Sequence, residues 1–322
     1  PFFDFPRRKP DYNAEVYAAT TRSIAASLKK HWGVNAELYF DDLDVGQKLN
    51  VQGEHQYAFV LKALKELQVI PVVALDRKDH NDAVKQLKRD GGIASATVAF
   101  RIEKVDFEDF DAIKEQFEDD LKDAFNEFNE IDLIFDCRLC IALDISDTGQ
   151  EIASFAKKFC AAYPVRRIIV TGSCIPPSIR DVLSTDDNTT LPRRELKIIA
   201  KARDLSLLEL VAGDYATVSP FYSDVDLAPE FMQNVMTPRL IYPFKHSYYI
   251  TRGVSMKSGG YGQYVGLTAD LCNQDFFRPG YSTGEEYFYE KSKGIGKNAT
   301  NGTVVKPSVV AHISYMVLGA KL

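Results

Sequence analysis

The chain has 322 residues, of which 45% are hydrophobic and 26% are charged, values of a globular protein and not of a disordered one. Its formal net charge of −6 provides no overall attraction for nucleic acid, and no apolar stretch approaches the roughly 18–20 residues that span a bilayer. The chain has five cysteines. An odd number of cysteines in a large chain favours a reducing compartment over a disulfide framework. We therefore expect a cytoplasmic protein without a membrane partner.

Seven short apolar runs carry charged or hydroxyl residues at or near their ends, and stretches long enough for a helix lie between them. The runs are Phe2–Phe5, Glu37–Asp42, Val69–Asp76, Ala96–Arg101, Ile131–Arg138, Arg167–Ser173 and Leu205–Tyr215. Helical spacing of apolar residues or helix-ending signals predict helices at Ala14–Trp32, Gln56–Leu67, Asn81–Arg89, Asp109–Asn129, Gln150–Tyr163 and Pro192–Asp204. This alternation predicts an α/β fold, a TIM-like (β/α)8 barrel whose active face lies at the carboxyl ends of its strands.

The alternation of apolar runs and helical segments ends near Ser219 and Pro220. Beyond them, Arg239–Arg252 is aromatic and β-prone, which predicts a strand or hairpin. Lys257–Tyr264 and Lys293–Gly302 are rich in glycine and polar residues and are expected to be loops, and Val309–Leu318 is an apolar strand or helix. We expect a barrel over residues 1–218 and an α+β extension over residues 219–322 that packs on it.

Four short motifs in one order and spacing resemble the beta protein family of phages and bacteria. They are Val170–Pro176, the pair Arg194-Glu195, Gly213–Tyr215 followed by Ser219-Pro220, and Ile250–Gly253. The family has no established biochemical activity, so the resemblance implies a fold and a phage or defence setting but no reaction.

Family members open with an extra strand before the equivalent of Phe2–Phe5. This chain starts at Pro1 without an initiator Met or a targeting signal, so we expect its first βα unit to be missing from the sequence. With that unit counted, Leu205–Tyr215 is strand eight. Without it, Arg239–Phe244 could close the barrel. The end of the alternation near residue 218 favours the first count.

On a closed barrel, the side chains at the strand ends would meet at one mouth. They are Asp4, Asp41, Asp42, Asp76, Arg101, Asp136, Arg138, Ser173 and Asp214. Arginine forks beside carboxylates suit the binding of phosphate or carboxylate groups. A structural interpretation is also open, in which the carboxylates cap helices and pair with the arginines.

The candidate ligand-binding residues are Arg101, Arg138, Ser173, Arg194 and Glu195. Asp76 and Asp136 are candidates for a catalytic base or metal ligand, and Asp214 for a second acid. The five histidines are scattered and show no metal-binding pattern, and Cys137 and Cys140 lack a second pair, so neither a metal site nor a cofactor is assigned.

Three functions remain open at this level. The first is binding of a small anionic ligand at the strand ends, with its hydrolysis as the reaction if the protein is an enzyme. The second is a non-catalytic module that acts in phage exclusion or defence through a protein partner. The third and weakest is nucleic-acid binding by the extension, through Arg239, Lys245, Arg252 and Lys257 with the nearby aromatic residues.

Overall fold

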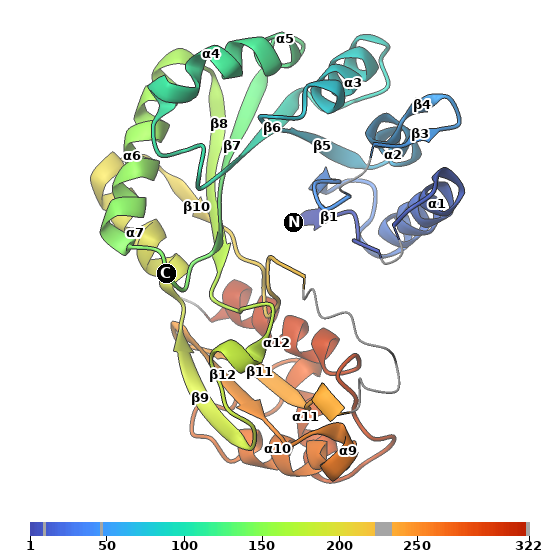
Figure 1. Cartoon of the computed structure of the whole chain (residues 1–322), viewed down its shortest axis with the longest axis vertical. Helices are drawn as coiled ribbons and strands as arrows, with labels where there is room; N and C mark the ends of the chain where they lie inside the picture. Colours follow the sequence, from blue (N-terminus) through green and yellow to red (C-terminus); the bar gives the residue numbers. More distant parts are fainter. Residues whose placement is uncertain (9–10, 46–47, 223–233, 320–322) are drawn as a thin grey trace. The chain divides into compact units, whose positions relative to one another are not determined.

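A computed structural model describes residues 1–8, 11–45, 48–222 and 234–319 (Figure 1). The chain divides into two compact units, and each is described by itself. The N-terminal unit comprises Pro1–Asp136, Gln150–Val170 and Ala202–Val211. The C-terminal unit comprises Cys137–Gly149, Thr171–Lys201 and Ala212–Leu322. The division into residues 1–218 and 219–322 stays a prediction.

Seven strands form one parallel sheet that curls into a half-barrel (Figure 1). Their order is β1-β2-β5-β6-β7-β8-β10. Neighbouring strands of this sheet therefore follow one another along the chain, apart from strands that belong to other sheets. The bounds are Phe2–Asp4, Glu37–Asp41, Gln68–Val73, Thr97–Glu103, Glu130–Leu139, Val165–Ser173 and Leu210–Ala212, respectively. All seven apolar runs of the sequence thus contain strands, which confirms the α/β class.

Helices follow these strands and lie on the convex side of the sheet (Figure 1). They are α1 (Ala14–His31), α2 (Gln56–Ala63), α3 (Lys78–Arg89), α4 (Phe110–Asp120), α5 (Lys122–Phe125) and α6 (Ile145–Ala162). A further helix, α7 (Arg194–Ser206), contributes residues to both units. A short hairpin of β3 (Asn50–Val51) and β4 (Glu54–His55) precedes α2. None of the helices in the described part of the chain is long and apolar enough to cross a membrane.

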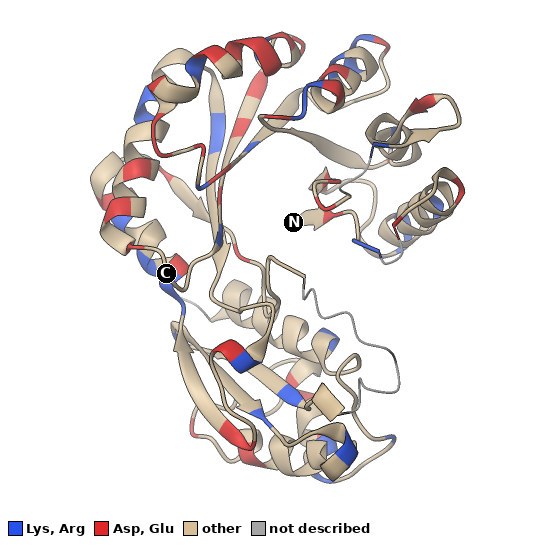
Figure 2. Ribbon diagram, in the orientation of Figure 1, with Lys and Arg blue, Asp and Glu red and all other residues tan. Residues whose placement is uncertain are grey.

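Local sequence explains where these helices begin and break. The side chain of Asn13 caps α1 by accepting a hydrogen bond from the amide of Val16 at 2.8 Å. The single acidic helix expected over Asp109–Asn129 is instead the pair α4 and α5, which is broken at the buried Leu121. On either side of the break, Phe117 and Phe125 pack with their ring centroids 5.1 Å apart. Figure 2 marks the acidic residues of α4 in red along its ribbon.

Both faces of the parallel sheet are covered, as β6 illustrates. Phe100 points to the convex side and packs against Phe117 and Phe159 of the helices. Its neighbour Ala99 points to the concave side, where it joins a buried cluster with Tyr39, Ile70, Val72 and Ile134. This apolar cluster lies between the charged residues at the carboxyl ends of the strands and the buried Asp132 of β7, which accepts a hydrogen bond from Tyr39 and pairs with Arg166.

The C-terminal unit contains an antiparallel sheet in the order β11-β12-β9. Its strands are β9 (Asp187–Pro192), β11 (Arg239–Phe244) and β12 (Ser247–Arg252), and its helices are α9 (Met256–Gly259), α10 (Gln263–Cys272), α11 (Thr283–Ser292) and α12 (Val305–Leu318), with a 3₁₀ turn at Ile179–Asp181. The predicted hairpin is confirmed. The alternative in which Arg239–Phe244 closes the barrel is wrong, because β11 pairs with β12.

Two details of the extension differ from the sequence-based expectations. Val309–Leu318 belongs to the helix α12, which settles the choice between strand and helix. The loop expected over Lys257–Tyr264 is wrong in part, because α9 and the start of α10 lie there. β9 was not expected, since Asp187–Pro192 is polar and becomes a strand only by pairing with β12.

The tyrosines of the antiparallel sheet are core residues. Tyr242 and Tyr249, paired across β11 and β12, pack on one face with the helices. Tyr248 packs on the other face with Ile175 and Ile179. All three are buried, so they serve the packing of the sheet. Nucleic-acid binding through the charged residues around them stays a prediction.

We expect Gly284→Ala to destabilise the C-terminal unit. A Cβ atom at Gly284 would lie 2.4 Å from the carbonyl oxygen of Pro307 and 2.8 Å from the amide nitrogen of Ala311, both backbone atoms of α12. Because backbone cannot move aside cheaply, the free energy of unfolding should fall by about 1–3 kcal/mol. Gly266→Ala is the matched control, since nothing lies within 4 Å of its Cβ on α10, and it should stabilise by about 0.5–1 kcal/mol. Denaturant unfolding measures both, and equal effects would contradict the close helix contact.

Candidate functional site

One buried guanidinium joins the carboxyl ends of four strands of the N-terminal unit. Arg101 of β6 is 3% exposed. Its Nε and Nη2 donate to Oδ2 of Asp136 in β7 at 3.0 and 2.7 Å. Its Nη1 donates to Asp4 of β1 at 2.9 Å and to Asp41 of β2 at 3.0 Å. The structure thus brings Arg101 and Asp136 into direct contact, as side chains of one ion network.

A second guanidinium completes this network, which we call the Arg101 cluster (Arg101, Arg77, Asp4, Asp41 and Asp136). Arg77 follows β5, and its Nη1 lies 2.7 Å from Oδ1 of Asp41. Burial opposes ionisation of Asp41, but the charges of Arg77 and Arg101 outweigh it and lower the pKa of Asp41. Burial raises the pKa of Asp4 to about 6, against the weaker effect of Arg101. The Arg101 cluster therefore contains three carboxyl groups and two guanidinium groups.

Arg101→Met should lower the free energy of unfolding by about 3–5 kcal/mol, because it leaves the buried Asp41 and Asp136 short of a counter-charge. Denaturant unfolding measures this loss. The control is Arg89→Met, which removes an exposed partner of Glu127 and should cost at most about 1 kcal/mol. If both variants were equally stable and Arg101→Met only lost ligand binding, the ligand role expected from the sequence would be favoured instead.

The raised pKa of Asp4 predicts a pH dependence of stability. Because the folded state favours the protonated Asp4, its stabilising contribution is complete below the ordinary value of 3.8 and is lost as the pH rises through about 6. Relative to Asp4→Asn, the wild type should lose on the order of 2–3 kcal/mol of unfolding free energy between about pH 4 and pH 7. Denaturation at a series of pH values tests this, with the carboxyl ¹³C shift of Asp4 as a direct readout. A constant difference would contradict it.

A cleft of about 550 Å³ lies in the same unit and shares Arg77 with the Arg101 cluster. Its walls come from the segments after β2 and β5 and from the start of α2, so it lies at the carboxyl ends of two neighbouring strands. Its charged lining consists of three cationic side chains (Lys48, Arg77 and Lys78) and four carboxylates (Asp42, Asp76, Asp79 and Asp120). It is the size of a small-molecule site.

The inner wall of the cleft holds a buried carboxylate and a buried imidazole. Asp42 accepts a hydrogen bond from Nε2 of Gln56 at 3.0 Å. Nδ1 of His80 lies 3.2 Å from Oδ1 of Asp42, and Nε2 of His80 lies 2.9 Å from the carbonyl oxygen of Val72. The ring of Tyr57 stacks on His80 with centroids 3.9 Å apart. Asp41, Asp42 and His80 each offer a ligand atom within 4.8 Å of the others.

Asp76 lines the cleft and has a strained backbone. Its φ is 58°, in the left-handed region that residues other than glycine rarely adopt. Its exposed side chain accepts a hydrogen bond from Nε2 of Gln116 at 2.7 Å. Aspartate adopts this region more readily than most residues, and the catalytic role expected for Asp76 stays a prediction.

The other predicted site residues lie in the C-terminal unit. Arg138 donates to the carbonyl oxygen of Pro220 at 3.3 Å and lies 5.4 Å from the ring centroid of Phe221. Its φ of 48° departs from the extended backbone of β7. Ser173, at the end of β8, donates to the carbonyl oxygen of Val218 at 3.1 Å. Their ligand roles, and a common mouth for all the strand ends, stay predictions.

Arg194, Glu195 and Asp214 surround a second buried arginine. Arg193 is 1% exposed, and it donates to Glu195 and to Asp214, each at 2.7 Å. Oδ2 of Asp214 also lies 2.8 Å from Nε2 of His312. Burial opposes ionisation of Asp214, but the hydrogen bond and charge of His312 and the charge of Arg193 lower its pKa overall. Arg194 itself donates to the carbonyl oxygen of Leu143. These contacts bring most of this set together as a structural ion centre of the C-terminal unit.

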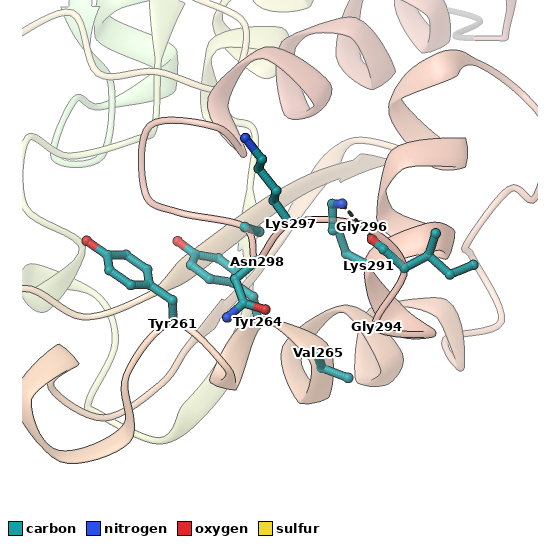
Figure 3. A pocket seen from close by; sticks show the side chains of 10 residues that line it. Tyr261, Tyr264, Val265, Lys291, Gly294, Gly296, Lys297 and Asn298 are labelled. Atoms are coloured by element: carbon teal, nitrogen blue, oxygen red, sulfur yellow. Dashed lines mark hydrogen bonds between the residues drawn. The ribbon is translucent and has the colours of Figure 1, made fainter.

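A small pocket of the C-terminal unit has no room for a ligand. Figure 3 shows Tyr261, Tyr264, Lys291 and Lys297 around it. Its volume is about 10 Å³, which is close to the minimum for one water molecule. Lys291 donates to the carbonyl oxygen of Ile295 at 2.8 Å and so closes the glycine loop beside it. The larger cleft of the N-terminal unit is therefore the better candidate site.

A family model described as Beta protein matches residues 1–318. The chain belongs to the Beta protein family. The resemblance carried by the four motifs is thereby confirmed. In the same comparisons, no curated protein and no solved structure matches the chain. Membership of the Beta protein family assigns no reaction, so the chemistry has to be inferred from the residues of the cleft.

Sequence reasoning missed several residues of the cleft, among them His80, Arg77 and Gln56. The signal for two of them is the dense run Asp76–His80 directly after β5, which has a charged or imidazole side chain at every position. His80 shows no pattern in the sequence because its partner Asp42 lies 38 residues earlier. No local pattern connects the two residues.

Proposed function

We propose that this member of the Beta protein family binds a small anionic ligand, bearing a phosphate or carboxylate group, in the cleft at the ends of β2 and β5. The observation that carries the proposal is the convergence of Lys48, Arg77 and Lys78 on one cleft of about 550 Å³. The parallel sheet adds support, since α/β sheets commonly bind ligands at the carboxyl ends of their strands.

The cations of the cleft are available at low cost. Lys48 pairs with Asp79 at 2.5 Å, but the side chains are 83% and 63% exposed. Lys78 lies 3.9 Å from Asp82 and is also exposed. Exposed pairs of this kind contribute at most about 1 kcal/mol, so a ligand anion can replace them. Arg77 differs, because its ion pair with the buried Asp41 keeps it in place at the back of the cleft.

Hydrolysis of the bound ligand is the second candidate, and Asp76 favours it. The residue presents an exposed carboxylate to the cleft from a left-handed backbone. A carboxylate within reach of a bound ester is a suitable general base for attack by water. Asp136, by contrast, is fully buried against Arg101, which favours Asp76 over Asp136 as the base.

The strand order also supports the finer prediction of a TIM-like (β/α)8 barrel. The seven strands follow the order of the chain, and β1 and β10 form the two edges of the sheet. An eighth parallel strand between these edges would complete the ring. In such a barrel the cleft would open at the face that barrel enzymes use.

The proposal is tested by ³¹P NMR titration with phenyl phosphate in the presence of EDTA. The double variant Lys48→Ala/Lys78→Ala should bind about tenfold more weakly, since each lysine contributes roughly 0.5–1 kcal/mol and 1.4 kcal/mol is a factor of ten. The matched control is Lys29→Ala/Lys65→Ala, which removes the same charge from residues outside the cleft.

Each outcome of this titration decides one part of the proposal. Equal losses in the two double variants, or no binding by the wild type, would contradict a site in the cleft. The same spectra show any released inorganic phosphate, and Asp76→Asn should abolish its release because asparagine tolerates the left-handed backbone but lacks the charge. If the ester binds and stays intact, the hydrolytic candidate is wrong.

A further inference from the structure

The hydrogen bond that Nε2 of His80 makes determines whether Nδ1 carries a proton in the neutral ring. Nε2 of His80 lies 2.9 Å from the carbonyl oxygen of Val72, which can only accept, so Nε2 carries a proton. A neutral ring then has a lone pair on Nδ1. That atom lies 3.2 Å from Oδ1 of Asp42, and His80 is only 6% exposed. Two acceptors therefore face each other in a buried place.

Nδ1 of His80 and Oδ1 of Asp42 can lie this close only if a proton or a metal cation is bound between them. The surroundings hold both in position: Gln56 donates to Oδ2 of Asp42, and Tyr57 stacks on the ring of His80. Oδ1 of Asp42 and Nδ1 of His80 are thus presented to the same point, with Asp41 within 4.8 Å. A histidine whose other nitrogen donates to a backbone carbonyl is the usual arrangement of a metal ligand.

The charges of this part of the unit favour a cation at Asp42 and His80. The buried or mostly buried carboxylates Asp4, Asp41, Asp42 and Asp136 outnumber the guanidiniums Arg77 and Arg101 that pair with them. A cation bound by Asp42 and His80 reduces this excess of acidic groups.

We propose that Asp42 and His80 bind a divalent transition-metal ion of the zinc class at the inner wall of the cleft. Mixed imidazole and carboxylate donors select such ions over Mg²⁺ and Ca²⁺, which prefer oxygen ligands alone. Asp41 pairs with Arg77 and Arg101, so it contributes negative charge near the ion. The cleft leaves the remaining coordination positions to water or to an anionic ligand. The inference goes beyond the proposed function, because the ion can bind without the anion.

The test is equilibrium dialysis of the full chain, stripped with EDTA, against Zn²⁺ alone. One Zn²⁺ should bind per chain, and the ¹⁵N resonance of His80 Nδ1 should shift on binding. His80→Ala and Asp42→Asn should each weaken the affinity by at least about tenfold. His31→Ala and Asp123→Asn are the matched controls, one an exposed histidine on α1 and the other an exposed carboxylate on α5 that does not line the cleft, and both should bind Zn²⁺ as the wild type does.

The inference is overturned if the wild type binds no ion, if the Nδ1 resonance does not move, or if the control variants lose as much affinity as the ligand variants. The ¹⁵N measurement on the wild type decides the matter even if His80→Ala does not fold. The phenyl phosphate titration contains EDTA, so it tests anion binding separately. If the wild type binds phenyl phosphate but no Zn²⁺, the metal site is wrong and the proposed anion binding stands.

Discussion

The attraction between Arg101 and the carboxylates at the strand ends constrains the geometry of the whole N-terminal unit. In the sheet order, β1 and β6 are separated by β2 and β5. Three strand spacings in a flat sheet are roughly 14 Å, more than one arginine side chain reaches. Yet Arg101 of β6 donates to Asp4 of β1 at 2.9 Å. Only a curled sheet permits this contact, so the curvature and the ion network require each other.

The candidate site depends on the same network. Arg77 pairs with Asp41 inside the Arg101 cluster and also lines the cleft. Asp41 belongs to the cluster, while the next residue, Asp42, turns to the cleft and to His80. A ligand or ion in the cleft would thus contact residues whose partners hold the strands together. Binding there is expected to stabilise the curled sheet, because the network and the cleft share their charges.

The C-terminal unit uses a buried arginine in a comparable way. Arg193 is held by Glu195 and Asp214 and lies 5.2 Å from the ring centroid of Tyr248. Glu195 and Asp214 of this centre come from two of the segments on which the sequence resemblance rested, Arg194-Glu195 and Gly213–Tyr215. Buried charges of this type are costly to leave unpaired. The motifs are therefore explained by the structure of this unit and do not by themselves indicate a reaction.

The sequence alone determined the elements of the parallel sheet and the polar nature of its strand ends. Apolar runs such as Ala96–Arg101 bury both faces of a strand, and this pattern is local. It also singled out Arg101, Asp136 and Asp76. The tertiary structure decided which charges meet: Arg101 contacts Asp4 and Asp41 across strands, and His80 meets Asp42 in the cleft. These contacts depend on the curl of the sheet and on the path of the chain after β5, so no spacing along the sequence could predict them.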